Sequence, residues 1–354
     1  MKVSLFFELI QASIGLRSDF SANISEQEGR KLYRETIRQS IAGITFTGFE
    51  KWWSQPGQDL PSWSYQWAAV QAACERNYAF QQQQLPKVVA LIEKEGLHYC
   101  LLKGLGMACL YPRPELRQGG DFDLWIDAPR KDIVEFAKKY GKVGDMLYHH
   151  VDAGKIEGVE VELHFTPSWM NDMVVNRRMQ RWFEECKSTC ITILDVNGAT
   201  IHVPTIEFNR IYILNHIYRH LFNEGIGMRQ IMDYYFVLCQ GCTEEEKAES
   251  MKLLKEFKMV GFARAVMWVM QRVFGLDRAF MLVEPDEERG RFLLKEIMMS
   301  GNFGKFDKRN TYNKNAPLWK RTSVRLSHDF RFVSQYPDET LWSPIWKTWR
   351  TLSQ

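Results

Sequence analysis

A pair of aspartates near the middle of the chain constrains the fold most. Asp121 and Asp123 stand two residues apart within GGDFDLWID, residues 119–127. On a β-strand, residues i and i+2 point to the same face, so both carboxylates would look into one space while the alternating apolar residues anchor the opposite face. Like charges this close repel each other. A bound divalent cation gives a reason for the pairing, and Mg²⁺ prefers carboxylate and phosphate oxygens.

A lysine–glycine turn precedes the aspartates. The pattern predicts a strand over 98–102, a turn at Lys103 and Gly104, and a short helix over 105–111. A helix N-terminus offers free N–H donors with a partial positive charge, and glycine lets a phosphate approach the backbone. The turn is therefore a candidate phosphate site, with Lys103 supplying a cation. The competing interpretation is a solvated lysine beside an ordinary left-handed glycine.

A second acidic strand is expected downstream. We expect strands near 146–151 and over 158–165, and the latter reads GVEVELHF. Its alternation places valine and leucine on one face, and Glu160, Glu162 and His164 on the other. Either glutamate is a candidate partner for the aspartate pair. A plain solvated polar face is the alternative.

These motifs together resemble the nucleotidyltransferase superfamily with the polymerase-β-like core, and most closely an uncharacterised bacterial branch of it. That branch shows a Leu-Lys-Gly turn, then Tyr-Pro, then Arg-x-x-x-Asp-x-Asp-Leu. Here these are residues 102–104, 111–112 and 117–124. The resemblance covers about residues 100–164, with a weaker echo to about Asp233. It implies an α+β fold, with a small mixed sheet and helices flanked by N-terminal and C-terminal helical regions.

The resemblance also implies a catalytic centre. The superfamily places a third metal-binding carboxylate on a strand beside the aspartates. Glu162 takes that position in the Glu-Leu-His motif, with Glu160 as the alternative. Asp121, Asp123 and Glu162 are then the catalytic residues and the ligands of two Mg²⁺ ions, and His164 is expected to contact a phosphate or to orient Glu162.

Phosphate recognition is expected from the lysine–glycine turn and from one arginine. The superfamily usually has Gly-Gly or Gly-Ser at the turn, whereas this chain has Lys103-Gly104-Leu-Gly. Arg117 is a candidate for the triphosphate or the leaving pyrophosphate, because a guanidinium matches phosphate oxygens bidentately. The competing interpretation is a structural ion pair between Arg117 and Asp121 or Asp123.

Four polar residues in the C-terminal region are candidates for a cleft. His216 and His220 stand at i, i+4 on a predicted helix, and Arg229 and Asp233 repeat that spacing. The resembling branch shows a similar set, so they are expected to hold the acceptor or the nucleotide. A zincin is excluded, since the HExxH glutamate is missing. The alternative is a buried histidine pair with an Arg229–Asp233 bridge.

The chain divides into three predicted parts, which are a helical region over 1–95, the nucleotidyltransferase core over 96–204 and a helical domain over 205–354. Ser25 and Glu28 form a candidate capping box, and Asn197-Gly198 predicts a hairpin over 191–203. In the N-terminal region we expect an irregular segment over 43–61 with a turn at Pro56-Gly57, then a helix over 61–84, and then a second helix over 87–95 that begins at Pro86 and ends at Gly96. In the C-terminal region we expect a loop over 301–317. The tryptophan-rich tail over 341–352 is expected to be an amphipathic helix that docks on the body or forms a dimer contact.

Composition limits the kinds of partner that we expect the protein to bind. The net charge is only +3, so no extended nucleic-acid surface is expected. The seven cysteines are scattered along the chain. Cys239 and Cys242 form a CxxC motif, but no second cysteine pair stands at zinc-ribbon spacing, so we expect reduced thiols rather than a zinc site. Cys186 and Cys190 are expected to pack. The N-terminal apolar run is broken by Glu8, and no other run approaches 18 apolar residues, so we expect a cytoplasmic protein without a membrane span.

We therefore expect a Mg²⁺-dependent nucleotidyltransferase that moves an NMP group from an NTP to an unidentified small-molecule or protein acceptor. The first alternative is a non-catalytic nucleotide-binding or partner-binding module on the same fold. The second is a metal-dependent phosphohydrolase that uses the same acids. The sequence leaves open whether the chain forms an oligomer.

Overall fold

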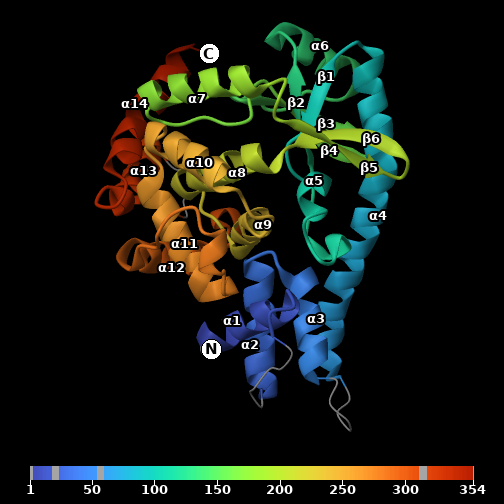
Figure 1. Cartoon of the computed structure of the whole chain (residues 1–354), viewed down its shortest axis with the longest axis vertical. Coiled ribbons are helices and arrows are strands. Elements are labelled where there is room, and N and C mark those ends of the chain that lie inside the picture. Colours follow the sequence, from blue (N-terminus) through green and yellow to red (C-terminus); the bar gives the residue numbers. More distant parts are fainter. Residues whose placement is uncertain (1–2, 18–23, 54–59, 311–316, 354) are drawn as a thin grey trace.

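A small mixed sheet stands between one long helix and two groups of shorter helices (Figure 1). The computed structural model describes residues 3–17, 24–53, 60–310 and 317–353, and it confirms the predicted α+β class. The helices are α1 (Val3–Ser13), α2 (Glu26–Arg38), α3 (Ala42–Trp53), α4 (Tyr65–Lys94), α5 (Leu105–Ala108), α6 (Arg130–Tyr140), α7 (Met173–Cys186), α8 (Ile206–Asn223), α9 (Met228–Leu238), α10 (Glu244–Glu256), α11 (Val260–Phe274), α12 (Glu287–Ser300), α13 (Leu318–Phe332) and α14 (Pro337–Ser353). The strands are β1 (His98–Leu101), β2 (Phe122–Asp127), β3 (His150–Ile156), β4 (Val159–His164), β5 (Ile191–Val196) and β6 (Ala199–Pro204).

The four-stranded sheet has the order β1-β2-β4-β3. The central strands β2 and β4 run parallel, and each edge strand is antiparallel to its neighbour. The register places Asp123 opposite Glu162 on the two parallel strands, and His150 opposite His164 on the antiparallel pair. The strands β5 and β6 form the predicted hairpin, with positive φ at both Asn197 and Gly198.

The two faces of the sheet differ in chemistry. The apolar side chains that alternate along β2 and β4 are buried in a core together with residues of α4, α6 and the hairpin. The residues between them, including Asp123, Trp125 and Glu162, point to the other face. There Trp125 stacks on Phe208 of α8. The sheet is thus closed on one side by α4 and α6, and its polar side faces the C-terminal helices.

The helix α4 runs along the molecule from the N-terminal helices to the sheet (Figure 1). Two helices were expected here, with Pro86 starting the second, but α4 is one helix of 30 residues with Pro86 inside it. Proline cannot donate to the carbonyl four residues earlier. Instead the side-chain amide of Asn197, in the hairpin turn, donates to the Gln82 carbonyl at 3.2 Å. Gly96, at φ +71°, ends the helix as predicted.

The N-terminal and C-terminal helices share one hydrophobic core. The segment expected to be irregular over 43–61 is a buried helix, α3, over most of its described length. Its glycines explain the error, because they serve close packing rather than a chain break. A Cβ added to Gly48 would lie 2.4 Å from Ser13 Oγ and 2.9 Å from the Leu9 carbonyl oxygen of α1. The capping box of Ser25 and Glu28 is confirmed at the start of α2.

Several predicted bounds need correction. The strand expected over 146–151 is β3, which begins at His150; Met146 forms only an isolated bridge to Val151. The helix expected over 105–111 is the single turn α5. The loop expected over 301–317 contains short 3-10 turns at Asn302–Gly304 and Lys308–Asn310. The turn at Pro56-Gly57 and residues 311–316 lie outside the described residues.

The tryptophan-rich tail forms α14. Its Trp346 is buried, and its ring lies 5.0 Å from that of Tyr148, so the tail docks on the body. In the described ranges, no helix has the length and apolarity that crossing a bilayer requires. The three-part division of the chain stays a prediction.

Candidate active site

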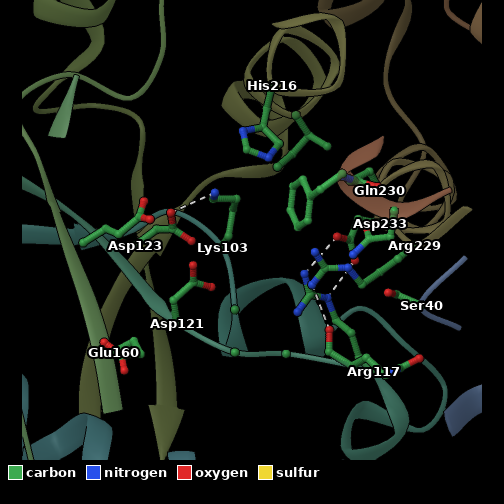
Figure 2. A pocket seen from close by; sticks show the side chains of 18 of the residues that line it. Ser40, Lys103, Arg117, Asp121, Asp123, Glu160, His216, Arg229, Gln230 and Asp233 are labelled. Atoms are coloured by element: carbon green, nitrogen blue, oxygen red, sulfur yellow. Dashed lines mark hydrogen bonds and ion pairs between the residues drawn. The ribbon is translucent and has the colours of Figure 1, made fainter. Parts of the chain in front are cut away.

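A polar cavity of about 610 Å³ lies between the polar face of the sheet and the helices α8 and α9. Figure 2 shows its two sides. Asp121, Asp123 and Lys103 lie on the sheet side, and Arg117, Arg229 and Asp233 lie on the opposite side. The lining residues are Ser40, Lys103, Gly104, Arg117, Gln118, Gly119, Gly120, Asp121, Asp123, Asp152, Glu160, Val161, Glu162, Ile213, His216, Ile217, Arg229, Gln230, Asp233, Asn302, Phe303 and Lys305.

The three predicted acids meet at the sheet side of this cavity. Asp123 and Glu162 are register partners on the parallel strands, so their side chains project from the same face. Asp121 lies just before β2 and is exposed towards the cavity. The negative charge of Asp123 is the main cause that raises the pKa of Asp121. The structure therefore brings together the residues that the sequence singled out, and it favours Glu162 over Glu160 as the partner of Asp123.

Glu160 also faces the cavity, but it pairs with Lys155 and does not lie opposite Asp123. It is exposed, and its carboxylate lies 3.8 Å from the Lys155 ammonium. It lies two residues before Glu162, which pairs in register with Asp123.

His164 is buried behind the carboxylates rather than at the cavity wall. Its Nε2 lies 3.1 Å from Asp123 Oδ1 and 3.5 Å from Glu162 Oε2. Burial alone would lower the pKa of His164, but the two carboxylates outweigh it and raise this pKa. Among the described residues that line the cavity His164 is absent. Of its two expected roles, orienting Glu162 agrees with this position and phosphate contact does not.

Lys103 reaches the acids directly. Its Nζ lies 2.8 Å from Asp123 Oδ1. Burial would raise the pKa of Asp123, but Lys103 and His164 hold it far below its usual range. The lysine thus offsets the repulsion within the acidic group. Gly104 adopts φ +65°, and an added Cβ there would lie 3.3 Å from the Asp121 carbonyl oxygen, so the turn requires glycine.

Arg117 has a structural partner that the sequence did not indicate. Its Nε and Nη2 donate to Asp233 Oδ1 and Oδ2 at 2.7 and 2.9 Å. The Tyr111 hydroxyl also donates to Asp233 Oδ1, at 2.7 Å. Both charged residues are buried. The expected ion pair of Arg117 with Asp121 or Asp123 is wrong, because Asp233 holds two of its donors. The expected contact of Arg117 with phosphate stays a prediction, since Arg117 also lines the cavity.

Arg229 is therefore not the bridge partner of Asp233. Its Nη1 donates to the Gln118 carbonyl at 2.9 Å, and its guanidinium lies 5.5 Å from the Phe303 ring centre. Within the described part of the chain, its buried Nε has no hydrogen-bond partner. Burial is the main cause that lowers the pKa of Arg229, followed by the charge of Arg117. Arg229 is therefore a cation with a free donor on this side of the cavity, which Lys305 also lines.

The two histidines of α8 have different surroundings. His216 lines the cavity, and its burial lowers its pKa well below the usual value. His220 lies beside Arg219 and Glu224, with its Nδ1 3.1 Å from Glu224 Oε2. Among the described lining residues His220 is missing, so its expected place in the cleft is wrong.

Sequence reasoning missed the wall supplied by the two helical regions. Ser40, Asn302, Phe303 and Lys305 reach the cavity from segments that carry no recognisable motif. Gln118 connects the site to the segment that carries Ser40, since its Oε1 accepts a hydrogen bond from the Ala42 N–H at 2.8 Å. The one local signal for this wall is that Gln118 directly follows the candidate site residue Arg117 in the sequence.

The cysteines take no part in this site. Cys186 and Cys190 both pack against the large hydrophobic core. Of the metal-competent groups among the described residues, none includes Cys239 or Cys242. All seven cysteines are free of disulfides, and the preference for reduced thiols over zinc at Cys239 and Cys242 stays a prediction.

The donor set fits Mg²⁺. Asp123, Glu162 and His164 each offer one ligand atom within 4.8 Å of the others. Asp121 projects into the same cavity and adds a third carboxylate. Oxygen donors of this kind, open to a polar cavity, are what Mg²⁺ requires when it also binds substrate phosphates.

The structure is thus an α+β fold in which two adjacent parallel strands present carboxylates to a polar cavity covered by helices. The family follows from comparison with known proteins. The model of the uncharacterised nucleotidyltransferase family matches residues 25–275, and the chain belongs to this family.

Other comparisons add less. A search of the curated proteins finds no match. The crystal structure of an antigenic nucleotidyltransferase-like protein from Paracoccidioides brasiliensis is similar at 14% sequence identity and a TM-score of 0.37. The similarity covers 59% of this chain and 96% of that one.

Proposed function

We propose that the chain transfers an NMP group from an NTP to a hydroxyl or amine of a small-molecule or protein acceptor, and that the transfer depends on Mg²⁺. One observation carries the proposal. Asp123 and Glu162 face each other in register on parallel strands, beside Asp121, at the wall of a cavity of about 610 Å³. A cavity of this size is within the range that takes a small-molecule ligand.

The place of each residue in or beside the cavity suggests its role in the proposed reaction. Asp121, Asp123 and Glu162 would hold two Mg²⁺ ions, which when bound lower the pKa of an attacking hydroxyl and offset the charge of the leaving pyrophosphate. His164 holds Asp123 and Glu162 in place from behind, at 3.1 and 3.5 Å. Lys103 neutralises part of the acidic group from the cavity side. Arg229 and Lys305 supply positive charge on the opposite wall for the outer phosphates.

Arg117 acts through Asp233. Their buried bidentate pair fixes the loop before β2 to α9. It therefore sets the distance between the acidic side of the cavity and Arg229, which lies one helical turn from Asp233. We assign Arg117 and Asp233 a positioning role.

The test is label transfer from α-labelled NTPs in the presence of Mg²⁺, with pools of small molecules and with the protein itself as acceptors. Asp123→Asn and Glu162→Gln are expected to lose about 100-fold or more in rate, because even residues that only support metal ligands cost 10–100-fold. The matched control is Glu135→Gln, which removes an exposed carboxylate on α6 that pairs with Lys131 at 3.8 Å. The control is expected to retain full activity.

Three outcomes would overturn the proposal. Release of free nucleotide without transfer indicates a phosphohydrolase. Retention of nucleotide without turnover indicates a binding module. Equal activity of Glu162→Gln and Glu135→Gln removes Glu162 from the site.

A further inference from the structure

Three histidines meet beside the acidic group. His149 directly precedes β3, His150 begins it, and His164 ends β4. His150 and His164 are direct partners across the antiparallel strands, so their side chains project from the same face. The ring centres lie 4.1 Å apart for His149 and His150, 5.3 Å for His149 and His164, and 5.2 Å for His150 and His164.

These rings are buried with unused nitrogens. His149 and His164 are 2% exposed and His150 is 8% exposed. Within the described ranges, the Nδ1 atoms of all three lack a hydrogen-bond partner. The Nδ1 of His150 lies 3.2 Å from Glu162 Oε2, but without the angles of a hydrogen bond. Buried polar atoms are nearly always paired, because an unpaired one costs free energy. The Nδ1 atoms of His149 and His164, left without a partner beside the His150 ring, therefore point to a ligand.

His164 already has the surroundings of a metal ligand. A histidine that binds a metal almost always uses its other ring nitrogen on a carboxylate, which fixes the ring and raises its basicity. The Nε2 of His164 lies on Asp123 at 3.1 Å. Its Nδ1 is buried without a hydrogen-bond partner among the described residues, which leaves it available to a metal.

The spacing also suits a compact metal site. One ring nitrogen from each of the three histidines lies within 4.8 Å of the others. Donors at 2.0–2.1 Å in tetrahedral geometry stand about 3.4 Å apart, so closure needs ring shifts on the order of 1 Å. Imidazole nitrogens favour zinc and related transition metals, whereas Mg²⁺ prefers oxygen.

Charged groups of both signs lie near the cluster. Asp123 and Glu162 both lie against His164. The nearby cations are Lys103, which pairs with Asp123 at 2.8 Å, and Arg219, whose guanidinium lies 4.0 Å from the Trp169 ring centre. The same ring lies 4.2 Å from that of His149, so Trp169 contacts both the guanidinium and the imidazole.

We propose that His149, His150 and His164 bind one transition-metal ion of the zinc class, at a site distinct from the oxygen-donor site at Asp121, Asp123 and Glu162. Asp123 and Glu162 support the site from outside, at 3.1 and 3.5 Å from His164 Nε2. A metal here would pin the β3–β4 pair. This proposal stands without the proposed nucleotide transfer, because its ligands are the three histidines.

The experiment uses the full chain, freed of metal by chelation and titrated with Zn²⁺ in the presence of excess Mg²⁺. One equivalent is expected to bind. His149→Ala and His150→Ala are expected to weaken it about 100-fold or more, since loss of a ligand costs more than loss of its support. His98→Gln, which changes an exposed histidine on β1, and the double variant Cys239→Ser/Cys242→Ser are matched controls that are expected to bind like the unmodified chain.

A second measurement covers variants that do not fold. Pulsed EPR of the unmodified chain loaded with one equivalent of Cu²⁺ detects nitrogen couplings from coordinated imidazole. More than one coupled imidazole is expected. The proposal is overturned by the absence of tight Zn²⁺ binding, by binding that persists in folded His149→Ala and His150→Ala, by binding lost in the cysteine variant, or by a Cu²⁺ spectrum without imidazole couplings.

Discussion

Replacing Asp233 with alanine is expected to destabilise the protein by about 4–6 kcal/mol. Asp233 accepts hydrogen bonds from Arg117 at 2.7 and 2.9 Å and from the Tyr111 hydroxyl at 2.7 Å. The side chains of Arg117 and Asp233 are only 5% and 10% exposed. Removing one partner of such a buried pair costs about 3–5 kcal/mol, because a charge stays buried without compensation. The unpaired phenol adds about 1 kcal/mol or more.

The assay is urea unfolding followed by circular dichroism and by tryptophan fluorescence, with coincident transitions as the check on two-state behaviour. The control is Glu249→Ala, which removes an exposed pair with Lys252 at 3.1 Å and is expected to cost less than about 1 kcal/mol. The double variant Arg117→Met/Asp233→Leu is expected to be more stable than Asp233→Ala, since no charge is then left alone. A cost for Asp233→Ala as small as that of the control would refute the structural role of the pair.

Three further predictions concern stability, each measured by urea unfolding. Burial raises the pKa of Glu339 to about 7 from 4.5; a raised pKa in the folded state stabilises at low pH and is lost as the pH rises through 7, so the contribution of Glu339 to the free energy of unfolding should fall by about 3 kcal/mol between pH 4.5 and 8. The difference in this free energy between the unmodified chain and Glu339→Gln should change by that amount, and a difference that stays constant with pH would contradict the buried carboxyl. Gly48→Ala should destabilise by about 1–3 kcal/mol despite better helix propensity, because its Cβ meets Ser13 and the α1 backbone; an increase in stability would contradict this packing. Asn197→Asp should cost about 1 kcal/mol, since a carboxylate has no proton to donate to the Gln82 carbonyl; an unchanged midpoint would show that the bond contributes nothing.

Local patterns in the sequence predicted local structure well. The alternation of β4, the Asn197-Gly198 turn and the capping box at Ser25 each depend on a few neighbouring residues, and the structure has all three. The resemblance identified Glu162 as an acidic partner, and Glu162 pairs in register with Asp123. Asp121, expected on the same strand as Asp123, lies just before β2. These inferences needed no knowledge of distant contacts.

Long-range pairing was beyond such reasoning. Arg117 and Asp233 are 116 residues apart, and nothing local distinguishes this pairing from an ion pair with Asp121. Pro86 was taken as a helix start because its broken hydrogen bond is visible in the sequence, whereas the compensating donor, Asn197, belongs to another element. The irregular segment expected over 43–61 is wrong for a similar reason, because the packing of α3 against α1 depends on a distant segment. The histidine cluster likewise exists only once β3 and β4 pair.

The most direct measurement of the central claim is a crystal structure with Mg²⁺ and an NTP analogue that resists cleavage at the α-phosphorus. The account predicts Mg²⁺ within about 2.0–2.1 Å of carboxylate oxygens from Asp121, Asp123 and Glu162, with the triphosphate extending towards Arg229. Mg²⁺ bound elsewhere, or a triphosphate held without contact between the metal and Glu162, would contradict it.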